Sequence, residues 1–123
     1  MAKYNCTCTI VNNTGSKISL AYVGKGTDED PSANEHDKKG KLYHGEMVTT
    51  PNTSIEVGAT GNFAAKSTGA TIQGTVCFNV PNESPAWVYF HVPSLGSRHN
   101  TSQNSSLSIN DDSAHAIMTW TIS

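Results

Sequence analysis

Apolar and polar residues alternate along several stretches of this chain, with the period of two that is typical of a β-strand. In residues 87–92 one face is entirely apolar and consists of Val88, Phe90 and Val92. The other face combines aromatic rings with a histidine, at Trp87, Tyr89 and His91. Pro93 has no N–H to donate to a neighbouring strand. We therefore expect the strand to end there and to open into a polar loop that runs to Asn104.

The same alternation predicts a series of short strands separated by glycine, proline and asparagine. A strand at residues 4–10 and another at 17–23 are expected to form a β-hairpin, because residues 12–15 are typical of a tight turn. Further extended segments are expected at residues 41–44, 46–49, 53–57, 74–80, 107–110 and 117–122. Residues 24–40 are interpreted as a surface loop. Residues 58–69 are interpreted as a loop, or as a loop with one helical turn at 63–66. This pattern indicates one all-β domain, an antiparallel β-sandwich or barrel.

Length and charge narrow the class of protein. A chain of 123 residues normally forms one domain, here residues 1–123. Its formal net charge of −2 and its scattered basic residues argue against a nucleic-acid-binding protein. The first residues lack the apolar region of a signal peptide, so we expect cytoplasmic synthesis. Because no apolar run approaches the ~18 residues of a spanning helix, membrane contact is expected to be peripheral or to arise by assembly.

The cysteines and acidic residues do not form a recognisable metal site, and no metal or cofactor is expected. Cys6 and Cys8 alternate on one face of the first expected strand, where a bond between them is geometrically awkward. All three cysteines are interpreted as buried thiols, although a disulfide from Cys77 to one of the others remains an alternative. The acidic residues of the 24–40 loop lack the spacing of an EF-hand, which favours solvation over calcium binding.

Nothing in the chain indicates catalysis, so we expect that it is not an enzyme. Five histidines are present, but neither a nucleophile elbow nor a metal-binding histidine pair accompanies them. His91 is interpreted as a strand-end residue bonded to the backbone, with a pH-sensing role as the alternative. Trp87 is interpreted as packing on the sheet, with an anchor at the water–bilayer interface as the alternative.

Several segments, in order, resemble the aegerolysin family, which includes the small component of binary insecticidal crystal toxins. Residues 8–15 are similar to the family's first strand and asparagine-rich turn, and residues 51–78 to its central block. Residues 88–93 and the glycine-containing loop that follows are similar to its aromatic strand and loop. The resemblance implies a single-domain antiparallel β-sandwich that binds sphingolipid or sterol-rich membranes and forms pores with a larger partner protein.

The chain departs from the family pattern at positions that bear on lipid specificity. The sphingolipid-binding members have a tryptophan at the place of Cys6 and an acidic residue near the place of Ala70. The C-terminal Gly-Ala-Leu-Gly signature is replaced by residues 113–117. The resemblance therefore implies the fold more strongly than it implies the lipid.

The resemblance implies the small component of a two-component pore-forming toxin, a cytolytic (hemolysin-like) or insecticidal protein that binds lipid outside the producing cell, at the membranes of target cells. Self-association of the chain is a further possibility. Arg98 is the expected phosphate contact, because its planar guanidinium donates two parallel hydrogen bonds. The full set of expected lipid- or receptor-binding residues is Trp87, Tyr89, His91, Ser97, Arg98 and Asn100. The alternatives are a glycan-binding or protein-interaction module on the same loops, and a structural or storage protein.

Overall fold

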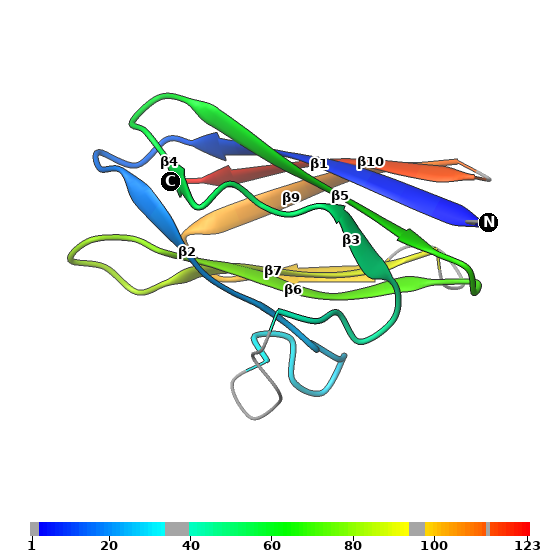
Figure 1. Cartoon of the computed structure of the whole chain (residues 1–123). Helices are drawn as coiled ribbons and strands as arrows, with labels where there is room; N and C mark the ends of the chain where they lie inside the picture. Colours follow the sequence, from blue (N-terminus) through cyan, green and yellow to red (C-terminus); the bar gives the residue numbers. More distant parts are fainter. Residues whose placement is uncertain (1–2, 34–39, 94–97, 113) are drawn as a thin grey trace.

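The computed structural model describes residues 3–33, 40–93, 98–112 and 114–123. In this part of the chain ten strands form two five-stranded sheets that pack face to face, and there is no helix (Figure 1). The first sheet has the order β3 (Glu46–Thr49), β5 (Thr60–Ser67), β1 (Tyr4–Asn12), β10 (His115–Ile122) and β9 (Ser105–Asp111). The second has the order β4 (Ser54–Ile55), β2 (Ile18–Gly24), β6 (Ile72–Asn79), β7 (Ala86–Val92) and β8 (Arg98–Thr101). The expected β-sandwich is confirmed.

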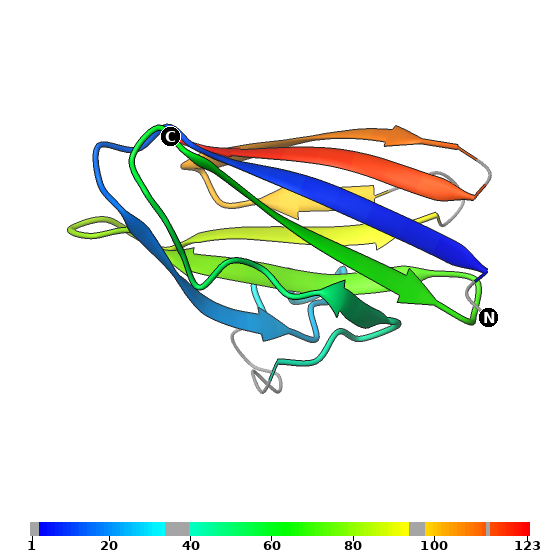
Figure 2. The same cartoon turned by 45° about the horizontal axis from the view of Figure 1, so that its top comes forward.

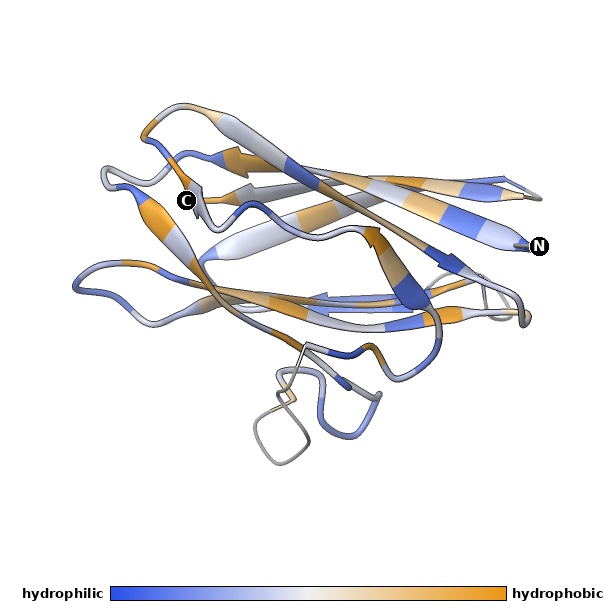
Figure 3. Cartoon of the chain, viewed as in Figure 1, coloured by the Kyte–Doolittle hydropathy of each residue, from blue (hydrophilic) through white to orange (hydrophobic). Residues whose placement is uncertain are grey.

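The core lies between the sheets and is built from alternate residues of the strands. Along β1 the buried positions are Tyr4, Cys6, Cys8, Ile10 and Asn12. Two aromatic pairs join the sheets across the core. The ring centroids of Phe63 and Phe90 are 5.6 Å apart, and those of Phe78 and Trp120 are 5.8 Å apart. Figure 3 shows apolar positions recurring along the strands of both sheets, as this packing requires.

The first and last strands of the chain, β1 and β10, pair in parallel in the first sheet, which places the two termini at opposite ends of that sheet (Figure 2). Their register places Cys8 beside Met118 and Ile10 beside Trp120. The other strand pairings of both sheets are antiparallel. The expectation of an antiparallel sandwich therefore holds except for this pair.

The expected hairpin between the first two strands is wrong, because β1 and β2 belong to different sheets. After β1 the chain crosses to the second sheet, and the buried side chain of Asn12 fixes the start of this crossover. Its Nδ2 donates to the carbonyls of Ser16 and Ile55, at 2.9 and 3.0 Å. Its Oδ1 accepts from the Thr14 hydroxyl at 2.6 Å. The residues expected to form a hairpin turn instead connect the first sheet to the second, and hydrogen bonds to the Asn12 side chain hold this connection in place.

The interpretation of residues 58–69 as a loop, with or without a helical turn, is also wrong, because they contain β5. This strand buries Gly61, Phe63, Ala65 and Ser67 in alternation and pairs with β1. The small residues of this segment suggest a loop, but at Gly61 the packing between strands requires a residue without a side chain. A Cβ at Gly61 would lie 2.6 Å from Cδ1 of Ile55.

All three cysteines are buried free thiols, as expected. Cys6 and Cys8 belong to the core cluster, whereas Cys77 faces the other side of the second sheet, so the alternative of a bridge to Cys77 is wrong. Burial raises the pKa of the Cys6 thiol to about 12. Among the described residues no helix is long and apolar enough to span a membrane.

Candidate ligand-binding face of the second sheet

The candidate site lies on the outer face of the second sheet, which is turned away from the first sheet. Val88 and Phe90 of β7 point into the core, so the alternating residues of this strand point outward. The strand register then places three rows of side chains across the outer face: Tyr22, Cys77 and Trp87; Thr75, Tyr89 and Asn100; and Gln73, His91 and Arg98.

The loop of residues 25–33 covers part of this outer face (Figure 1). The Thr75 hydroxyl donates to the carbonyl of Pro31 at 2.5 Å, and the Tyr22 hydroxyl donates to the carbonyl of Ser32. The loop approaches so closely that a Cβ at Gly26 would lie 1.8 Å from the Thr75 hydroxyl oxygen. The loop therefore buries positions that strand alternation assigns to solvent.

A chain of polar contacts links the loop to three strands. The Tyr89 hydroxyl donates to Oδ1 of Asp28 at 2.6 Å and accepts from Nε2 of Gln73 at 3.0 Å. Nη2 of Arg98 lies 3.0 Å from Oδ2 of Asp28 and 2.7 Å from Nδ1 of His91. Arg98 can only donate, so Nδ1 of His91 accepts and the imidazole is neutral, with its proton on Nε2.

This cluster shifts the titration of its members. The hydrogen bond from Tyr89, followed by the contacts with Arg98, lowers the pKa of Asp28. Burial, followed by the positive charge of Arg98, lowers the pKa of His91. Burial, with the hydrogen bond to Asp28, raises the pKa of Tyr89. The cluster thus holds a carboxylate, a neutral imidazole and a neutral phenol at neutral pH.

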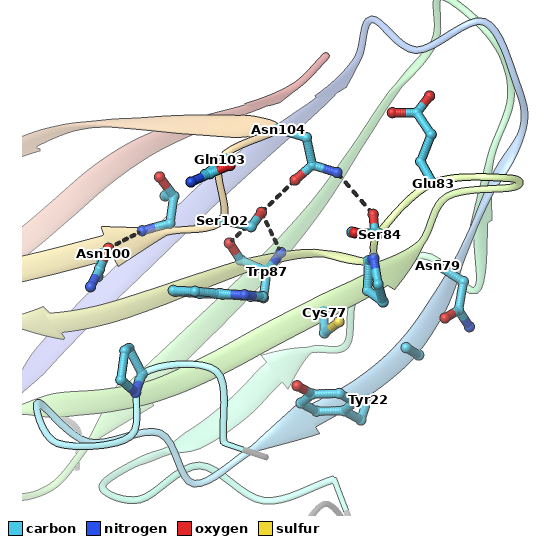
Figure 4. Close-up of a pocket in the computed structure, with 14 residues that line it drawn as sticks. Tyr22, Cys77, Asn79, Glu83, Ser84, Trp87, Asn100, Ser102, Gln103 and Asn104 are labelled. Atoms are coloured by element: carbon cyan, nitrogen blue, oxygen red, sulfur yellow. Dashed lines mark hydrogen bonds between the residues drawn. The ribbon is translucent and has the colours of Figure 1, made fainter.

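A groove of about 1090 Å³ lies beside the cluster, bounded by Pro31, by the turn of residues 81–85 before β7 and by the turn of residues 102–104 between β8 and β9 (Figure 4). The lining residues that the structure describes are Ala21, Tyr22, Pro31, Cys77, Asn79, Glu83, Ser84, Pro85, Trp87, Asn100, Thr101, Ser102, Gln103 and Asn104. Trp87 is the partly exposed aromatic residue of β7 within it.

Hydrogen bonds fasten the walls of the groove to one another. Asn104 accepts from the Ser102 hydroxyl at 2.6 Å and donates to the carbonyl of Ser84 at 2.9 Å, which joins the two turns (Figure 4). The Ser102 hydroxyl also accepts from the backbone N–H of Trp87 at 3.0 Å. The groove is therefore formed before any ligand enters.

The structure places five of the six expected site residues on this outer face. Trp87 and Asn100 line the groove, whereas Tyr89 and His91 are buried in the cluster, with exposures of 2% and 9%. Arg98 lies in the cluster too. Ser97 lies outside the described residues.

Arg98 and Asn100 were expected on a loop but lie on β8, so that expectation is wrong. Their pairing with β7 is a contact between strands that a turn-rich sequence does not signal.

Sequence reasoning missed several residues of the site. Asp28 was read as a solvated carboxylate, and Gln73 preceded the segment expected as a strand. Tyr22 alternates with Ile18 and Leu20 in the sequence, which predicts that all three share one face of the strand, and residues 102–104 were expected as loop. The strand register shifts between Leu20 and Tyr22, so Tyr22 lies on the outer face instead. The described residues contain no group of three or more histidine, cysteine or acidic side chains that could hold a metal.

Comparison with known proteins identifies the fold. No protein-family model and no curated protein sequence matches the chain. Among solved structures, the chain is similar to the crystal structure of the lipid binding protein Nakanori, with a TM-score of 0.66 and 12% sequence identity. The similarity covers 100% of this chain and 72% of that one. At this identity the comparison shows a shared β-sandwich fold.

Proposed function

We propose that this chain binds membrane lipid and receives the lipid headgroup in the groove of the second sheet. The observation that carries the proposal is the partly exposed Trp87 in a groove whose rim is formed by amide and hydroxyl groups. Indole and phenol rings favour the boundary between headgroups and acyl chains, because each has an apolar body and a polar edge. The similarity in fold to a lipid-binding protein supports the proposal.

The size and rigidity of the groove also support the proposal. Small-molecule sites commonly occupy about 300–1,000 Å³, and the groove of about 1090 Å³ is slightly larger than this range. Asn104 links its own turn to the turn of Ser84 by a hydrogen bond, so little ordering of the protein is needed when a ligand binds.

The finer part of the proposal concerns a two-component toxin that is synthesised in the cytoplasm of the producing cell and acts outside it, on the membranes of target cells. This chain would dock on the target membrane, and a larger partner would form the pore. The support is the ordered resemblance of its segments to the aegerolysin family. The purified chain alone should leave dye-loaded vesicles intact while it is bound to them. Dye release by the chain alone would contradict this division of roles.

Sedimentation with liposomes tests the lipid-binding proposal directly. The vesicles contain phosphatidylcholine alone, or phosphatidylcholine with sterol, sphingomyelin, ceramide phosphoethanolamine or an anionic lipid. Selective sedimentation with one composition is the expected result. If no composition carries the protein down, the proposal is wrong for these lipids and a protein receptor takes its place.

A pair of variants locates the contact. Trp87→Ala should weaken vesicle binding at least about tenfold, because a central aromatic anchor typically contributes ~2 kcal/mol or more. The matched control is Ile117→Ala, which shortens a 53% exposed side chain on β10 of the other sheet. If the control loses binding and Trp87→Ala retains it, the membrane-binding surface is on the first sheet.

A further inference from the structure

We infer that the group received by the groove is an uncharged sugar, presented either as a free glycan or as the headgroup of a glycolipid. The inference rests on the proposed function, since it assigns the ligand to the same groove. It departs from the phosphate contact that the sequence suggested for Arg98.

The charges around the groove do not suit a phosphate. Among the described lining residues there is no lysine or arginine, and Glu83 contributes a carboxylate. Proteins that recognise phosphate or other anions typically place an arginine fork or a lysine at the ligand. Among these described residues, a phosphate would meet the Glu83 carboxylate without an opposing cation.

The arginine of the same face is already engaged. Nη2 of Arg98 is 3.0 Å from the Asp28 carboxylate and 2.7 Å from the His91 ring, so its charge is balanced within the cluster. Arg98 is not among the described residues that line the groove. Its guanidinium attaches the loop of residues 25–33 to the sheet through Asp28.

The polar groups of the groove instead match hydroxyl groups. A sugar hydroxyl both donates and accepts, and asparagine and glutamine amides offer a donor and an acceptor side by side. Within the described part of the chain, no hydrogen bond to the protein occupies the amides of Asn79 and Gln103. Asn100 uses its Oδ1 to accept from the Thr101 N–H at 2.9 Å, which leaves its Nδ2 to donate (Figure 4).

The aromatic side chains of the groove complete the match. Trp87 and Tyr22 lie on the same face, on either side of Cys77 in the row across β2, β6 and β7 (Figure 4). An aromatic face carries partial negative charge and attracts the weakly positive C–H bonds on one side of a pyranose ring. A ring stacked on Trp87 would present its hydroxyls to Asn100 and to the turn of residues 102–104.

Tryptophan fluorescence combined with vesicle sedimentation tests the inference. The chain has two tryptophans, and Trp120 is fully buried in the core, so an emission change on binding reports Trp87. The probes are phosphatidylcholine vesicles with neutral glycosylceramides, the same vesicles with sphingomyelin or phosphatidylserine, and an array of soluble glycans. The expected result is binding and an emission shift with the glycosylceramides, reversed by excess free sugar.

The outcomes separate the inference from the proposed function. Binding to sphingomyelin or phosphatidylserine that free sugar leaves unchanged overturns the inference and keeps lipid binding. Binding to soluble glycans without vesicle binding keeps the inference and overturns lipid binding. No response to any probe overturns both.

Two variants connect the result to named groups. Asn100→Ala should weaken glycosylceramide binding roughly tenfold, because a sugar hydroxyl enclosed in the groove would lose the hydrogen bond donated by Nδ2 of Asn100. Ser108→Ala, an exposed position on β9, is the matched control and should bind as the wild type does. Trp87→Phe should abolish the emission shift while keeping a ring in place. An unchanged shift in Trp87→Phe would overturn the assignment of the ligand to this groove.

Discussion

The clearest test of the polar cluster is Asp28→Asn, which keeps the shape of the side chain and removes its charge. In the wild-type protein Asp28 accepts from the buried Tyr89 hydroxyl at 2.6 Å and pairs with Arg98 at 3.0 Å. Asparagine retains an oxygen for Tyr89 but pairs with no cation. The change should therefore weaken the attachment of the loop of residues 25–33 to the sheet.

The expected loss can be worked out from the two contacts. A hydrogen bond to a charged group contributes about 1.5–3 kcal/mol and a neutral one about 0.5–1.5 kcal/mol, so the exchange at Tyr89 removes roughly 1 kcal/mol. The side chains of Arg98 and Asp28 are 41% and 46% exposed, and such a pair contributes at most about 1 kcal/mol. The free energy of unfolding should fall by about 1–2 kcal/mol, which lowers the melting temperature by about 3–10 °C.

Urea unfolding at two pH values measures this loss and identifies its cause. The pKa of Asp28 is lower in the folded state than its ordinary value. Its stabilisation is therefore present above the ordinary pKa of ~3.9 and is lost as the pH falls through the folded-state pKa. The deficit of Asp28→Asn should be full at neutral pH and should disappear in acid.

Glu29→Gln is the matched control, because it neutralises an exposed carboxylate of the same loop and should leave stability unchanged. The reasoning is refuted if Asp28→Asn unfolds at the same urea concentration as the wild type at neutral pH. It is refuted equally if the deficit persists unchanged in acid.

Three further changes probe the crossover, the strand β5 and the histidine. Asn12→Ala should lower the free energy of unfolding by about 2–4 kcal/mol in urea, because it strips several buried hydrogen bonds at once. Gly61→Ala should lower the free energy of unfolding by about 1–3 kcal/mol, because the added Cβ would lie 2.6 Å from Cδ1 of Ile55. Gly15→Ala is the control and should leave stability unchanged, because its Cβ would meet nothing within 4 Å. Equal effects of the two changes would contradict the packing argument. The pKa of His91 is lowered in the folded state, so the unfolded state takes up a proton first as the pH falls. The free energy of unfolding should therefore decline as the pH falls through ~6.5, and His91→Gln should make this decline less steep. An identical pH dependence in the variant would refute this role of His91.

The sequence reasoning about Arg98 illustrates the limit of local patterns. A charge on an exposed loop contributes little to folding, so the loop position expected for Arg98 implies that alanine could replace it without loss of stability. In the structure it lies on β8 and donates to Asp28 and His91, so the same replacement should lower stability by about 1 kcal/mol. Its positive charge is used within the protein, which the residues around it in the sequence do not reveal.

By itself the sequence determined the all-β class, most of the strands and the apolar face of those strands whose alternation is unbroken, because alternation is a local property that burial of one face imposes on the chain. It determined that Trp87 and Asn100 belong to a surface with polar and aromatic groups. The tertiary structure decided which sheet each strand joins, that residues 58–69 contain a strand, and that the loop of residues 25–33 closes over Tyr89 and His91. These features depend on contacts such as those from Asp28 to Tyr89 and Arg98, which are 61 and 70 residues apart in the chain. A pattern of neighbouring residues carries no information about partners at such separations, so only the folded chain brings the groove and its cluster together.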